Sequence, residues 1–132
     1  MEYPQVQFNA GLDTAITIST ILKRCEYYAR IQDFSNWYNE LLILERRLIA
    51  KIDRSKKKKD IIKEIQEAKE DKNNVLNIYQ KKLSRAKKIP FAIAHQLYSY
   101  LANYECVLRK YVDVFGFLGP ELESQTKAIL QR

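Results

Sequence analysis

The sequence predicts an all-α protein, an antiparallel four-helix bundle that forms a single domain over residues 1–132. Three Gly and three Pro among 132 residues are too few for the many turns of a sheet protein. Apolar residues make up 46% of the chain, which is typical of a globular domain with a core. In the long segments between turns, these residues recur at spacings of three and four. We expect helices at about 9–31, 34–53, 57–86 and 90–115, followed by a short C-terminal helix or tail.

The first expected helix, 9–31, follows an extended lead-in that contains Pro4. Asn9 or Asp13 could cap its N-terminus, because both side chains accept hydrogen bonds from a first helical turn. The β-branched run at 15–21 could also be read as a strand. No second strand candidate lies nearby to pair with it, so a helix is favoured.

The second expected helix, 34–53, starts at Asp33 or Ser35 and carries the only tryptophan, Trp37. Aromatic side chains gather around its first turn. Their positions are Tyr27, Tyr28, Phe34, Trp37 and Tyr38. Such a group could be a stacking platform for bases or a packed corner of the core. The helical spacing favours the packed corner.

The third expected helix, 57–86, has a thin apolar seam that includes Lys72. The turn before it lacks Gly and Pro, so the second and third helices could be nearly continuous. Its outer face is densely charged, and we expect pairs at spacings of three and four along the helix. The residues of that face are Lys63, Glu64, Glu67, Lys69, Glu70 and Asp71.

The fourth expected helix, 90–115, is the best defined, because Pro90 suits a helix start and Gly116 a left-handed C-terminal cap. One apolar line runs down it at steps of three and four. A second line steps by seven through Ile93, Tyr100, Val107 and Val114. A face this broad needs two or three covering helices. The second line either packs on the first helix or meets another copy.

Positive charge is concentrated in two segments of a chain whose net charge is +7. The first basic cluster comprises Arg46, Arg47, Lys51, Arg54, Lys56, Lys57, Lys58 and Lys59. The second basic cluster comprises Lys81, Lys82, Arg85, Lys87 and Lys88. Lysine-rich sets bind phosphate as point charges, without the pattern that reads bases. A helix of about 28 residues spans ~42 Å, so the clusters should lie at opposite ends of one chain.

Catalytic and cofactor motifs are missing from the sequence. His95 is the only histidine, and no glutamate lies three residues from it, as carboxylate–histidine metal bundles require. Cys25 and Cys106 lie at mostly apolar helical positions, which favours reduced, packed thiols over an interhelical disulfide. No phosphate loop or nucleophile elbow is present. We therefore expect no enzymatic activity, no cofactor and no metal.

The expected function is non-catalytic binding of DNA or RNA through phosphate contacts at the two basic clusters, as an accessory protein and as an oligomer. The alternative is a structural or adaptor protein that packs a partner or itself through its apolar helical faces. Binding of Lys56–Lys59 to an anionic membrane surface ranks last. No segment reaches the length of a membrane span, and no secretory signal opens the chain, so we expect a cytoplasmic protein.

The order of elements resembles that of small helical proteins carried by phages and other mobile elements. An aromatic-rich hairpin comes first, a Lys/Glu helix follows, and a long helix ends near Gly116-Phe117-Leu118-Gly119-Pro120. The resemblance covers most of the chain. It implies an all-α bundle and carries over no activity and no site residues.

Overall fold

The computed structural model describes residues 17–83 and 88–116. Within these residues the chain forms helices and turns and no strand, so the predicted all-α class is confirmed. The α-helices are α2 (Ile18–Arg30), α3 (Phe34–Lys51), α4 (Lys58–Lys69), α5 (Val75–Ile78) and α6 (Phe91–Val114). A π-helical turn, η1 (Tyr79–Leu83), continues from α5.

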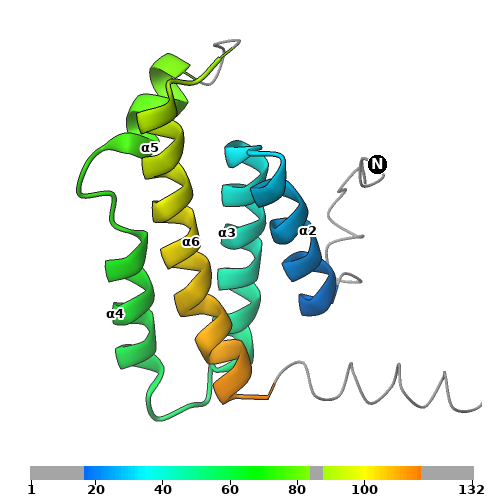
Figure 1. Ribbon diagram of the computed structural model, residues 1–132. Coiled ribbons are helices and arrows are strands. Elements are labelled where there is room, and N and C mark those ends of the chain that lie inside the picture. Colours follow the sequence, from blue (N-terminus) through cyan, green and yellow to red (C-terminus); the bar gives the residue numbers. More distant parts are fainter. Residues whose placement is uncertain (1–16, 84–87, 117–132) are drawn as a thin grey trace, which may run out of the picture.

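The helices alternate in direction, as the predicted bundle requires. Figure 1 shows α2 and α4 running one way and α3 and α6 running the other. The helix α3 packs against both α2 and α6, and α6 packs in turn against α4. The core therefore centres on the contact between α3 and α6, which run in the same direction.

The core side chains recur at steps of three and four along each helix, which is why one face of each is buried. The helix α6 contributes Leu97, Leu101, Tyr104, Leu108 and Val112. The helix α3 contributes chiefly Phe34, Trp37, Leu41, Leu44 and Leu48. Fully burying one leucine side chain stabilises the fold by about 1.5–3 kcal/mol. The two helices that carry the most of these residues therefore hold the bundle together.

Local signals set the helix ends where the structure describes them. Asp33 caps α3, because its Oδ1 accepts a hydrogen bond from the Asn36 N–H at 3.2 Å. Gly116 adopts the predicted left-handed conformation, with φ of +64°. Pro90 precedes the first residue of α6 instead of occupying it. Thr17 caps α2, whereas Asn9, Asp13 and the expected C-terminal helix lie outside the described residues.

The expected helix 57–86 is interrupted, and this boundary prediction was wrong. The helix α4 ends at Lys69, Glu70 is extended, and Asn74 is left-handed with φ of 54°. A continuous helix would place Lys72 in the apolar seam, where burying an unpaired ammonium group is costly. The break leaves Lys72 exposed, and Val75 returns the chain to the core.

The charged face of α4 is also arranged differently from the prediction. Lys69 Nζ lies 3.3 Å from Glu45 Oε2 on α3, and Glu64 Oε1 lies 2.8 Å from Lys110 Nζ on α6. The hydroxyl of Tyr111 also donates to Glu64. These ion pairs join α4 to its neighbours instead of running along its own surface. The pairs expected within the helix are replaced by links between helices.

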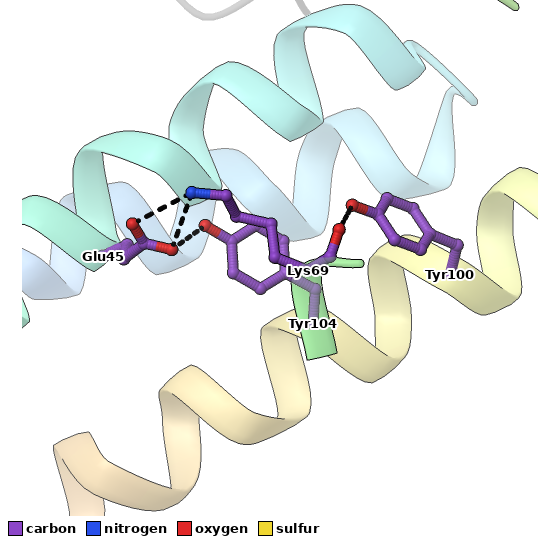
Figure 2. Close-up of polar contacts among 4 residues, drawn as sticks. All are labelled: Glu45, Lys69, Tyr100 and Tyr104. Atoms are coloured by element: carbon purple, nitrogen blue, oxygen red, sulfur yellow. Dashed lines mark hydrogen bonds and ion pairs between the residues drawn. The ribbon is translucent and has the colours of Figure 1, made fainter. Parts of the chain in front are cut away.

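Glu45 is the centre of a buried polar network (Figure 2). It is 7% exposed, and its Oε1 accepts a hydrogen bond from the Tyr104 hydroxyl at 2.7 Å. Burial, with this bond as the second cause, raises the pKa of Tyr104 well above its usual range. The hydroxyl of Tyr100 donates to the backbone oxygen of Lys69, the last residue of α4. The network thus fixes the position at which α4 ends.

Tyr100 also shows where the second apolar line of α6 points. Because its hydroxyl reaches α4, the line faces α4 and not the first helix of the bundle. Ile93 and Val107, at the same seven-residue register, are half-buried. Val114 at the end of the line is 66% exposed.

Candidate nucleic-acid interface

The turn between α3 and α4 presents most of the first basic cluster to solvent. Arg54, Lys56, Lys57 and Lys59 are exposed there. Lys58 is half-buried and pairs with Asp53, the only acid in the cluster. In the described part of the chain, the ammonium groups of Lys56, Lys57 and Lys59 have no ion-pair partner within 4.0 Å. The turn therefore holds a dense set of unneutralised cations.

The backbone gives this turn a defined shape. The Ser55 N–H donates to the Ile52 oxygen at 2.8 Å, and the Lys57 N–H donates to Ser55 Oγ at 3.2 Å. Lys57 then forms the N-terminal boundary of α4, as predicted, without a side-chain cap. The positive end of a helix is an unfavourable place for lysines and a favourable one for phosphate. A bound phosphate would relieve this repulsion.

The remaining members of the first cluster lie on α3. Lys51, its last residue, is exposed beside the turn. Arg46 is exposed and Arg47 half-buried, about one turn earlier on the helix. Lys51 therefore lies next to the turn residues, whereas the two arginines lie farther up α3.

The second basic cluster is described in part. Lys81 and Lys82 are exposed on η1, and Lys88 is exposed just before α6. Arg85 and Lys87 lie outside the described residues. Figure 1 shows η1 at the opposite end of the bundle from the α3–α4 turn. The 24 residues of α6 correspond to about 36 Å, so the two clusters do not form one patch on a single chain.

Two rings of the aromatic group around the start of α3 are packed in the core, and Tyr27, Tyr28 and Tyr38 are half-buried. Phe34 and Trp37 are 0% and 2% exposed. The indole Nε1 of Trp37 donates to Glu105 Oε1 at 2.9 Å, and the Phe34 ring meets the edge of Tyr79 at 5.8 Å. Neither of these two rings is open to a base, so the packed-corner interpretation holds for Phe34 and Trp37.

Sequence reasoning missed one exposed ring at the end of the bundle opposite the α3–α4 turn. Phe91, the first residue of α6, is 87% exposed. Its ring stacks on His95 with a centroid separation of 6.3 Å and an interplanar angle of 13°. The available signal was its register, because the two apolar lines of α6 begin at Ile93 and Ala94 and leave Phe91 out.

The two cysteines differ in environment. Cys25 is buried, and burial, with Glu105 as the second cause, raises the pKa of its thiol well above its usual range. Cys106 is exposed, so the prediction of two packed thiols holds only for Cys25. Neither forms a disulfide. Among residues 17–83 and 88–116, no three His, Cys, Asp or Glu side chains gather in a group that could hold a metal ion.

An open groove of about 740 Å³ runs between α2 and α6 above Trp37. Tyr98, Ala102 and Cys106 line its α6 side, and Ala29 lines its α2 side. Its wall also includes acids and bases in equal number, namely Glu26, Glu105, Asp113, Arg30, Arg109 and Lys110. This groove contains no residue of either basic cluster.

Comparisons of the sequence with protein-family models, curated proteins and solved structures found no match. Within the described ranges, no helix has the length and apolar character needed to cross a membrane.

Proposed function

We propose that this protein binds nucleic acid without catalysis, through phosphate contacts at its two basic clusters. Lysines contact phosphate as point charges and release counterions, so binding should be sequence-independent and strongly dependent on salt. The role that fits such binding is that of an accessory protein on DNA or RNA.

The observation that carries this proposal is the α3–α4 turn. Lys56, Lys57 and Lys59 are exposed, without ion-pair partners among residues 17–83 and 88–116, on a turn whose backbone is held by hydrogen bonds. The positive end of α4 adds its own N–H groups at the same place. Exposed ammonium groups and helix N–H groups at one place are the donors that a phosphate contact uses.

A salt titration tests the proposal. Fluorescence anisotropy with labelled duplex DNA, at 50–300 mM salt as a working range, yields the slope of log affinity against log salt. Lys56→Gln, Lys57→Gln and Lys59→Gln together should lower this slope by about 2–3, since each lost phosphate contact removes about 0.9. The Lys58–Asp53 pair stays intact in this variant.

The matched control removes three exposed lysines that lie elsewhere: Lys23, Lys63 and Lys72, each replaced by glutamine. Its net charge equals that of the test variant, so its slope should stay close to that of the unmodified protein. If the slope fell equally in both variants, net charge alone would drive binding and the turn would not be a site. No detectable binding at 50 mM salt would refute the proposed function.

The groove between α2 and α6 favours a second candidate, self-assembly through a second copy of this chain. Its apolar lining would exclude water, and its balanced charges make the surface compatible with itself despite the overall charge of +7. Ala102→Arg would obstruct the groove. Sedimentation should then show a dimer for the unmodified chain and a monomer for the variant, whereas a monomer in both cases would dismiss this candidate.

A further inference from the structure

The end of the bundle that carries Phe91 combines an open aromatic ring with uncompensated positive charge. From Lys72 to Tyr104 the sequence contains six basic residues and no Asp or Glu. Of these bases, Lys81, Lys82 and Lys88 are exposed at the same end as the start of α6. Lys88 lies three residues before Phe91. Unlike the α3–α4 turn, this end thus presents a flat apolar surface beside its cations.

Phe91 is the most exposed large apolar residue in the described part of the chain. Its 87% compares with 66% for Val114, the next highest, and 50% for Ile31. His95 lies nearly parallel to it, one helical turn away, and supports one side of the ring. The high exposure shows that the rest of the ring is open to solvent. Phe91 does not pack in the core, since the buried residues of α6 begin at Leu97.

We propose that this end, which we call the Phe91 site, binds single-stranded nucleic acid by stacking an unpaired base on Phe91 while Lys81, Lys82 and Lys88 contact the flanking phosphates. The inference rests on the proposed function and specifies its ligand. Successive bases stack on aromatic side chains without regard to sequence, and a positively charged surface follows the backbone. In a duplex the base faces are occupied by their neighbours, and opening a step costs a few kcal/mol. A single strand is therefore preferred.

The surroundings of Phe91 favour a base over a lipid surface. Its exposed neighbours on the first two turns of α6 are Ala92, His95 and Gln96, which are small or polar. A helix that lies in a membrane interface needs a broad apolar face, and one ring does not supply it. The hollow that His95 lines on its other side also contains three acids, Glu67, Glu70 and Asp71, and one base, Lys72. The phosphates should therefore lie on the Lys88 side of the ring.

Three ligands of equal length test the site: a labelled twelve-nucleotide single strand, the same strand with abasic sugars, and the corresponding duplex. The unmodified protein should bind the single strand more tightly than the abasic strand, which keeps the phosphates and lacks the bases. Phe91→Ala should weaken single-strand binding by about 5- to 100-fold, as expected for loss of one stacked base. It should leave the abasic strand and the duplex unchanged.

Phe91→Trp should retain or strengthen single-strand binding, and Val114→Ala serves as the control because it removes an exposed apolar side chain at the other end of α6. Thermal unfolding of each variant checks that the fold is intact, as expected for a side chain outside the core. Equal affinity for the strand and its abasic form, with Phe91→Ala unchanged, would overturn this site and leave the proposed function standing.

Absence of binding to all three ligands would overturn both proposals. The last measurement is binding of the protein and of Phe91→Ala to vesicles of phosphatidylserine and phosphatidylcholine. Vesicle binding that is lost in Phe91→Ala, without any preference for the base-bearing strand, would show that the ring serves a membrane surface and would overturn the site.

Discussion

At the scale of single residues, Glu45 shows how a buried charge can be tolerated in this bundle. Its carboxylate lies between α3, α4 and α6 and is held by Lys69 and by the Tyr104 hydroxyl. A buried carboxylate that loses one of its donors retains its charge and loses compensation. The network therefore makes stability depend on a hydroxyl group that lies 59 positions from its acceptor.

Tyr104→Phe should destabilise the protein by about 1–3 kcal/mol, because it removes one hydrogen bond to a charged group and keeps the ring in place. Urea unfolding followed by circular dichroism measures the change. Tyr98→Phe is the matched control, since that hydroxyl belongs to an exposed residue on the same helix. If the free energy of unfolding fell by a similar amount in both variants, the hydrogen bond to Glu45 would contribute nothing to stability.

Glu64 leads to a prediction about pH. The hydrogen bonds from Lys110 and, second, from Tyr111 lower the pKa of its carboxyl group below the usual value of 4.5. The unfolded chain therefore binds this proton more readily than the folded protein does, and stability falls as pH drops through the folded-state pKa. Above pH 4.5 the contribution of Glu64 is fully present.

Glu64→Gln should lower the unfolding midpoint slightly at pH 7, on the small scale of solvent-exposed ion pairs. The difference from the unmodified protein should shrink as the pH falls below 4.5 and through the lowered pKa of Glu64. Thermal melts across this range provide the comparison. Glu67→Gln, an exposed position one turn away, should show no such convergence. A pH-independent difference for Glu64→Gln would contradict the ionic origin of its effect.

At the scale of elements, helix ends were predictable where a local signal determines them. Asp33 and Gly116 act through their own side chain or backbone, so their roles can be read without knowing the fold. The break after Lys69 lacks Gly and Pro and has only the weaker signal of Asp71, Asn73 and Asn74, residue types that favour turns and left-handed backbone. It depends on Glu45, which pairs with Lys69 from another helix. Boundaries set by tertiary contacts were therefore the ones missed.

The turn between α2 and α3 contains a residue whose backbone is under strain. Gln32 has φ of 57°, a left-handed conformation that costs a side chain about 1–2 kcal/mol. Gln32→Gly should stabilise the protein by about 0.5–1 kcal/mol, because glycine removes this cost and loses part of the gain to its greater freedom when unfolded. Chemical denaturation measures the difference.

Gln66→Gly provides the opposite case, since Gln66 is exposed within α4. There glycine should destabilise by about 1 kcal/mol. If both substitutions destabilised equally, the strain assigned to Gln32 would be absent in solution.

At the scale of the whole molecule, the basic clusters were visible in the sequence, but their surroundings were not. Counting charges locates Lys56–Lys59 and Lys81–Lys88, and the lengths of the helices place them far apart. The exposure of Phe91 depends on how α6 is rotated against α3, which composition does not determine. The placement of Trp37 depends in the same way on a contact between helices, the hydrogen bond from its indole to the half-buried Glu105.

The separation of the two clusters predicts how many short strands one chain binds. The length of α6, about 36 Å, exceeds by several-fold the distance of about 8 Å over which charges interact at physiological salt. The two ends should therefore act independently in a monomer. An eight-nucleotide single strand at physiological salt should titrate to two strands per chain by calorimetry.

Removing either cluster should then leave one strand per chain. The variant with Lys56, Lys57 and Lys59 changed to Gln keeps the end that carries Phe91. The variant with Lys81, Lys82 and Lys88 changed to Gln keeps the α3–α4 turn, and combining the two sets should abolish binding. If either triple variant alone abolished binding, the clusters would have to meet in one site. Because they lie at opposite ends of one chain (Figure 1), only contact between different copies could bring them together.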